Sequence, residues 1–153
     1  MNIGIDLHDT ISYRPILFKQ LIDGWINTNY VIIITGTPTS NKQHVIDLLT
    51  KHQIRYHDIA LGFNYNKQNM DITHFVKMRD WKLSLCKEYM IDLYIDDNPY
   101  YVKYIADYGI CTLQPILSSM YINEWSKKDP FFTCHLQKLQ FDFLFEQNLQ
   151  RKE

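Results

Sequence analysis

The sequence lacks the features that mark an exported, membrane-spanning or zinc-stabilised protein. Its three cysteines, Cys86, Cys111 and Cys134, are odd in number and have no zinc or redox spacing. Reduced thiols in a cytoplasmic protein are therefore the simplest interpretation. Asp6 and Asp9 interrupt the start of the chain, so we expect no signal peptide. No apolar run is long enough to cross a bilayer, so we expect no membrane contact.

The chain also lacks a charge imbalance and any repetitive segment. Its formal net charge is -1, which gives the molecule as a whole no attraction to nucleic acid or to an anionic membrane. Hydrophobic residues are 46% of the total, as in ordinary globular domains. No Gly/Ser-rich linker divides the chain. We therefore expect one domain over residues 1–153, with a core at about 1–115 and a helical extension at about 116–153.

What the chain does have is an alternation of short apolar runs and segments of helical period. The expected strands are short and mostly β-branched, and they cover residues 2–5, 30–34, part of 54–61, 91–95 and 109–113. The expected helices begin near Pro15, at Thr39 or Ser40, at Asp80 and at Pro99. Strands separated by helices of this size pair in parallel through right-handed crossovers. The predicted fold class is α/β, with three layers and a mostly parallel central sheet.

Reactive side chains stand where three of these strands end. Asp6 follows the first strand, Thr35 and Gly36 follow the second, and Asp96 with Asp97 follows the fourth. In open α/β sheets, ligands bind at the carboxyl ends of the strands. Lys82 is expected to open the helix that precedes the fourth strand. Phosphoryl transfer uses such a set, because a carboxylate can attack phosphorus while a cation, a hydroxyl and an ammonium group hold the phosphoryl oxygens.

The same segments resemble a known family. IGIDLHDTI resembles the first motif of the haloacid dehalogenase (HAD) superfamily, and VIIITGT is similar to the second. Lys82, within KLSLCKEYMIDLYIDDNP, resembles the third motif, and Asp96-Asp97 the fourth. The resemblance covers about the first two-thirds of the chain. It implies a Rossmann-like core and a Mg²⁺-dependent phosphatase that works through an aspartyl-phosphate intermediate.

The resemblance also implies a role for each matched residue. Asp6 would be the nucleophile, and Thr35, Gly36 and Lys82 would hold the phosphoryl oxygens. The ligands of Mg²⁺ would be Asp6, Asp96, Asp97 and the backbone carbonyl of His8.

Ordinary structural roles remain as alternatives to these assignments. Asp6 could cap a turn, and Asp96 with Asp97 could be a solvated cap of the next helix. Lys82 could be a surface lysine, with Lys77 and Lys87 as rivals for its role.

His8 is the one departure from the family pattern, which has a second aspartate there as general acid and base. Imidazole titrates near pH ~6.5 and can replace that carboxyl group at neutral pH. Two alternatives stay open: His8 slows turnover, or the site has become a binding module for a phosphorylated ligand or partner. Asp9 occupies a position where the family tolerates Gly or Asp, and we expect no catalytic role for it.

The spacing of the motifs leaves no room for a separate cap domain. A capless enzyme of this kind is expected to act on a small phosphorylated substrate, such as a sugar phosphate or a nucleotide. A phosphatase for polynucleotide or protein ends is the alternative, although nucleic acid is the less favoured partner. Residues 64–79 are either a small flap that contacts substrate through Asn64, Tyr65, Asn66, Lys67 and Arg79, or a solvated loop. The helix expected at residues 135–149 is apolar on two faces, which indicates burial or a homo-oligomer.

Overall fold

The computed structural model describes residues 1–66 and 70–128. The chain forms two compact units, Met1–Pro115 and Ile116–Glu153. In the second unit the described part contains the helix α5 (Ser119–Lys128). The helix expected at residues 135–149 lies outside the described residues, so its proposed role in self-association stays a prediction, as does the assignment of residues 1–153 to one domain. None of the helices within the described ranges has the length and apolar character needed to cross a membrane.

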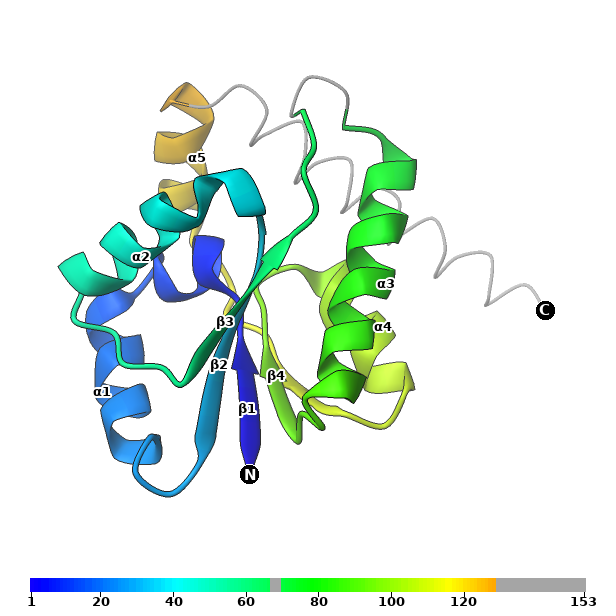
Figure 1. The fold of residues 1–153 in the computed structure, drawn as a ribbon. Coiled ribbons are helices and arrows are strands. Elements are labelled where there is room, and N and C mark those ends of the chain that lie inside the picture. The colour runs from blue at the N-terminus through cyan, green and yellow to red at the C-terminus, as the bar shows by residue number, and fades with distance from the viewer. Residues whose placement is uncertain (67–69, 129–153) are drawn as a thin grey trace. The chain divides into compact units, whose positions relative to one another are not determined.

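The first unit is built around a five-stranded parallel sheet (Figure 1). Its strands are β1 (Asn2–Ile5), β2 (Tyr30–Pro38), β3 (Asp58–Gly62), β4 (Leu93–Ile95) and β5 (Cys111–Leu113). Their order is β3-β2-β1-β4-β5, and every neighbouring pair is parallel. The predicted α/β class is confirmed. Because β1 lies at the centre, the chain crosses to the other half of the sheet between β3 and β4, which places a topological switch point beside β1.

Helices cover both faces of the sheet, so that it forms the middle of three layers. In Figure 1, α1 (Pro15–Trp25) and α2 (Lys42–Lys51) lie on one face, and α3 (Ile72–Glu88) and α4 (Pro99–Asp107) lie on the other. Successive strand residues point to opposite faces. Accordingly, Ile33 packs in the core on the α1/α2 side, and Ile32 with Ile34 packs on the α3/α4 side. The β-branched residues of β2 therefore pack in the apolar cores on both faces of the sheet.

Two helices begin at other residues than the sequence predicted. Thr39 lies in a 3₁₀ turn (Thr39–Asn41) and α2 begins only at Lys42, so the predicted cap at Thr39 or Ser40 is wrong. The helix α3 begins at Ile72, where the side chain of Asp71 accepts a hydrogen bond from the backbone N–H of His74.

The predicted cap at Asp80 is therefore also wrong, because Asp80 lies inside α3. Lys82 is an interior residue of that helix and does not open it. The polar residues that precede Ile72 hid the start of this helix, although Phe75 and Met78 lie on its buried side.

Candidate active site

Three aspartates meet at the carboxyl ends of β1 and β4. We call Asp6, Asp96 and Asp97 the carboxylate cluster; one ligand oxygen from each lies within 4.8 Å of the others. Asp6 and Asp96 are buried, with 5% and 1% of their surface exposed. The two strands are adjacent, and the backbone N–H of Asp6 donates to the carbonyl of Ile95 at 2.8 Å. The sequence prediction that these three carboxyl groups come close enough to share one cation is confirmed.

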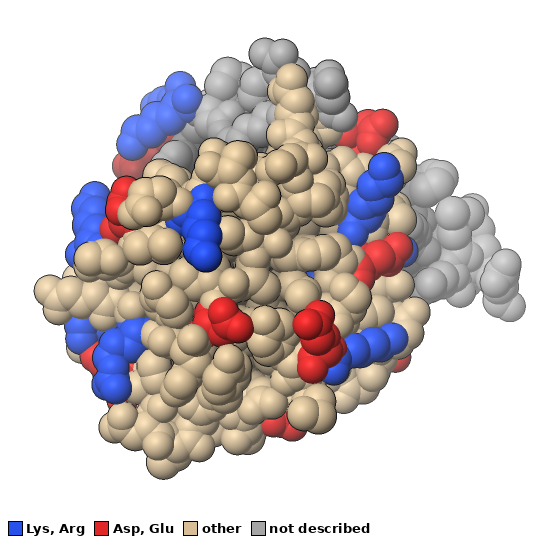
Figure 2. All heavy atoms as spheres, in the orientation of Figure 1, with Lys and Arg blue, Asp and Glu red and all other residues tan. Residues whose placement is uncertain are grey.

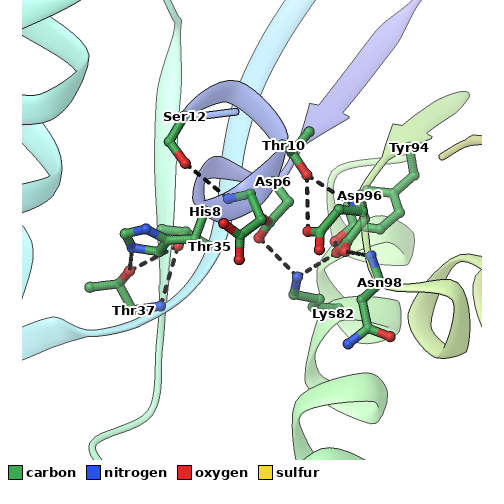
Figure 3. Close-up of polar contacts among 12 residues, drawn as sticks. Asp6, His8, Thr10, Ser12, Thr35, Thr37, Lys82, Tyr94, Asp96 and Asn98 are labelled. Carbon is green, nitrogen blue, oxygen red and sulfur yellow. Dashed lines mark hydrogen bonds and ion pairs between the residues drawn. The ribbon is translucent and has the colours of Figure 1, made fainter. Parts of the chain in front are cut away.

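Lys82 lies within hydrogen-bonding distance of two of these carboxylates. Its Nζ is 2.9 Å from Oδ1 of Asp6 and 2.5 Å from Oδ2 of Asp96, so the ammonium group lies between them (Figure 3). Only 4% of the Lys82 side chain is exposed, whereas Lys77 and Lys87 are exposed. The interpretation of Lys82 as a surface lysine is therefore wrong, and its two rivals lie elsewhere on α3.

The carboxylate of Asp96 has several donors around it. Besides Lys82, the hydroxyl of Tyr94 donates to Oδ2 at 2.5 Å and the backbone N–H of Asn98 donates to Oδ1 at 2.9 Å. The cap of α4 is Asn98, whose side chain accepts a hydrogen bond from the N–H of Tyr100. Asp96 and Asp97 are therefore not the solvated cap that the alternative interpretation required.

Thr10 holds Asp97 from the turn after β1. Its Oγ1 donates to Oδ1 of Asp97 at 3.2 Å and accepts from the backbone N–H of Asp97 at 3.0 Å. Thr10 is fully buried. Sequence analysis assigned it no role, although its place as the last residue of the Asp-x-x-x-Thr segment was the available signal. The contact links the ends of β1 and β4 and orients the third carboxylate.

The carboxylate cluster carries more negative charge than Lys82 can balance. Burial raises the pKa of Asp6 to about 7; Lys82 opposes this shift and Asp96 adds to it. Burial, followed by the charges of Asp96 and Asp6, also raises the pKa of Asp97 well above its usual value. For Lys82, burial alone would lower the pKa, but the charges of Asp6 and Asp96 outweigh it and keep the ammonium charged.

When all three carboxyl groups are ionised, they and the one ammonium leave two negative charges, which matches a divalent cation. Oxygen ligands from a few carboxylates are what Mg²⁺ prefers in proteins. The residues present thus fit a magnesium site.

Hydroxyl groups stand on the other side of Asp6, at the end of β2. Thr35 and Thr37, which we call the threonine pair, have their Oγ1 atoms 2.9 Å apart, and the N–H of Thr37 donates to Oγ1 of Thr35 at 3.3 Å. The predicted end of this strand at residue 34 is wrong, because β2 continues through a bulge to Pro38 and keeps pairing with β3. At Gly62 a Cβ would lie 2.5 Å from the carbonyl oxygen of Gly36, so the bulge brings two backbones together where only glycine fits.

His8 reaches this second group of side chains. Its Nε2 lies 2.8 Å from Oγ1 of Thr37, and Figure 3 shows the ring turned toward the threonine pair. His8 belongs to the π-helical turn η1 (Leu7–Ile11), in which Asp9 has a positive φ of 59°. That backbone conformation favours Gly, Asn and Asp, which is a structural reason for the residue at position 9. Sequence analysis did not single out Thr37, although its place two residues after Thr35 puts both on one side of the strand.

The segment that was interpreted as either a flap or a loop is divided in two. Its second part, from residue 72 onward, belongs to α3, so a solvated loop is wrong there. In the first part, Tyr65 is half-buried and packs on His74, with ring centroids 4.4 Å apart. Arg79, on α3, donates to the hydroxyl of Tyr100, and its guanidinium carbon lies 3.8 Å from the ring centroid of Tyr104. Both contacts hold the Arg79 side chain against α4. Lys67 lies outside the described residues, and contact of this segment with substrate stays a prediction.

Comparison with known proteins gives a likeness in fold alone. No protein-family model matches the chain, and no curated protein sequence matches it. A chain in the solved structure of the Pnkp1/Rnl/Hen1 RNA repair complex superposes on 77% of this chain with a TM-score of 0.56 and 15% sequence identity. The match spans 43% of that chain, so this protein corresponds to less than half of its neighbour. The assignment of chemistry therefore depends on the residues described above.

Proposed function

We propose that this protein is a Mg²⁺-dependent phosphatase of the HAD type that forms an aspartyl-phosphate on Asp6. The observation that carries the proposal is the carboxylate cluster with the ammonium of Lys82 inserted into it. A structural ion pair would need one carboxylate for one ammonium, and two further carboxylates add negative charge that Lys82 does not balance. A site that binds a cation and a phosphoryl group uses all of these charges.

Asp6 is the residue placed to attack. One of its carboxylate oxygens would form a bond to phosphorus while the bond between phosphorus and the leaving oxygen breaks, and His8 would give that oxygen a proton. Water then attacks the aspartyl-phosphate, His8 takes the proton of that water, and inorganic phosphate leaves. General acid and base catalysis of this kind contributes about 10²- to 10⁴-fold to the rate. Burial favours attack by Asp6 because its carboxylate has little water to lose.

The cation would be held by Asp6, Asp97 and the backbone carbonyl of His8. Asp97 accepts a hydrogen bond from Thr10, whereas Asp96 already accepts three, from Lys82, Tyr94 and the N–H of Asn98. This difference supports Asp97 as a direct ligand of the cation. Asp96 would contact the cation directly or through a water molecule. When bound, Mg²⁺ supplies positive charge to the phosphoryl oxygens and to Asp6.

The remaining groups would hold the phosphoryl oxygens. Lys82 supplies a charge that its carboxylate neighbours keep in place. The hydroxyl of Thr35 and the N–H of Gly36 lie on the strand next to β1 and are the proposed hydrogen-bond donors. Donors fixed before the reaction cost no reorganisation when the negative charge moves.

We propose a small phosphorylated compound, a sugar phosphate or a nucleotide, as the substrate of this capless site. A single helix, α1, stands between η1 and β2, which leaves no room there for a cap domain. The likeness to a chain of an RNA repair complex makes an end-phosphorylated oligonucleotide the second substrate to test. On the face shown in Figure 2, basic and acidic side chains of the described residues are interspersed and no broad basic patch is seen there.

The test is a set of phosphate esters, including sugar phosphates, nucleotides and an end-phosphorylated oligoribonucleotide, incubated with Mg²⁺ or with EDTA. We expect phosphate release that needs Mg²⁺ and disappears in Asp6→Asn but not in Asp23→Asn, a matched change on the surface of α1. Binding of phosphorylated compounds without turnover in the wild type would support the binding module instead. A large gain of activity in His8→Asp would show that His8 slows the enzyme.

A further inference from the structure

We propose that Thr37 is a positioning residue for this reaction: it holds the imidazole of His8 in the orientation in which His8 exchanges a proton with the leaving oxygen. The inference depends on the proposed function and extends it to a residue to which no motif assigns a role. It starts from the contact between Nε2 of His8 and Oγ1 of Thr37 at 2.8 Å.

The two partners differ in how firmly they are held. His8 is exposed and lies in the turn η1, whereas Thr37 is 7% exposed and belongs to β2. The Thr37 hydroxyl also contacts Oγ1 of Thr35, a residue with no exposed surface. An exposed side chain samples several rotamers, and catalysis needs one of them. A buried hydroxyl on a strand can select that rotamer because its own position is fixed.

The contact with Thr37 matters because this chain has His8 where the family pattern has an aspartate. An imidazole is larger than a carboxyl group, and its two nitrogens are distinct, so its orientation decides which nitrogen faces the substrate. The contact with Thr37 engages Nε2. The strand supplies this hydroxyl two residues after Thr35, on the same side, at the bulge where Gly62 of β3 approaches the backbone of Gly36.

Thr37 also contacts Thr35, so an effect through His8 must be separated from one through phosphoryl binding. If Thr37 acts through His8, Thr37→Val lowers kcat and leaves KM nearly unchanged. If it acts through Thr35, the same change raises KM. We expect kcat to fall roughly ten- to hundredfold, the cost of a misplaced acid or base.

The kinetic experiment compares wild type, Thr37→Val, Thr37→Ser, His8→Ala and the double variant His8→Ala/Thr37→Val. Thr37→Ser keeps the hydroxyl and should restore most of kcat. In the His8→Ala background, Thr37→Val should cost almost nothing further, because the group it positions is gone. Thr112→Val, a half-buried strand threonine on β5, is the matched control and should leave kcat unchanged.

A second measurement does not depend on activity. In protein labelled with ¹⁵N-histidine, His8→Ala identifies the His8 resonances. Thr37→Val should shift the Nε2 resonance of His8, and Thr37→Ser should leave it close to its wild-type position.

Three results would each overturn the role of Thr37. They are an unchanged Nε2 resonance in Thr37→Val, an increase in KM without loss of kcat, and losses of kcat that multiply in the double variant. None of these results resembles the failure of the proposed function, in which Asp6→Asn would keep full activity.

Discussion

The two sides of Asp6 solve the problem of burying polar groups in opposite ways. On the β4 side, the carboxylate cluster and Lys82 carry full charges, and the pKa values of Asp6 and Asp97 are raised by burial. On the β2 side, the threonine pair and His8 are joined by hydrogen bonds between a ring nitrogen and hydroxyls. The charged side has an excess of negative charge, and the β2 side has its hydrogen bonds made within itself.

The difference indicates a division of work. A hydroxyl that is hydrogen-bonded holds its position at little cost, whereas buried like charges raise the free energy of the folded protein until a cation joins them. The charged side is therefore expected to make the folded protein less stable until it binds a cation. The β2 side is expected to position groups. Two measurements test this difference directly, and a third tests an aromatic contact outside both sides.

The largest effect is expected from removing the ammonium on the charged side. Lys82→Met should lower the free energy of unfolding by about 3 to 5 kcal/mol, because two buried carboxylates lose their partner. Urea unfolding in EDTA measures it. The control is Lys19→Met, which breaks the partly exposed pair of Lys19 and Asp23 on α1 and should cost less than about 0.5 kcal/mol. Equal losses in the two variants would remove the distinction between a buried cluster and an ordinary surface pair.

A smaller effect of opposite sign is expected from Asp97→Asn. The raised pKa of Asp97 means that its charge opposes folding when no cation is bound, so the neutral amide should stabilise the protein by about 1 kcal/mol in EDTA. The new side chain keeps an oxygen that can accept from Thr10. Addition of Mg²⁺ should raise the melting temperature of the wild type more than that of the variant. The control is Asp47→Asn, on the surface of α2, which should change neither the stability in EDTA nor the effect of Mg²⁺. Destabilisation by Asp97→Asn would contradict an excess of negative charge in the carboxylate cluster.

The smallest effect concerns His74, which packs against Tyr65 beyond the end of β3. Burial lowers the pKa of His74, so the folded protein binds a proton there less readily than the unfolded chain. The stability that depends on neutral His74 is complete above the unfolded pKa of about 6.5 and is lost as the pH falls below it. His74→Phe keeps an aromatic ring and should remove this loss. Thermal unfolding between pH 7 and pH 5 compares the two proteins, and parallel curves would show that His74 does not titrate.

Sequence reasoning located the strands and the charged side well. The strand β1 has the predicted bounds, and Asp6, Asp96 and Asp97 lie together as expected from adjacent parallel strands. Helix starts were less predictable, because Asp71 and Asp80 are both ordinary capping residues and local sequence does not say which one is used. The β2 side was predicted only in part. The contact between Thr37 and His8 joins residues that are 29 positions apart, and the bulge of β2 depends on its pairing with β3.

The sequence by itself determined the α/β class and the residues that end each strand, because β-branched runs and helical periodicity act locally. Only the tertiary structure decided that Lys82 lies between two carboxylates, that Thr10 holds Asp97 and that Thr37 contacts His8. These contacts join residues 14 to 87 positions apart. Such pairs form when strands align and helices pack on them, and their geometry follows from the whole sheet, which no short stretch of sequence specifies.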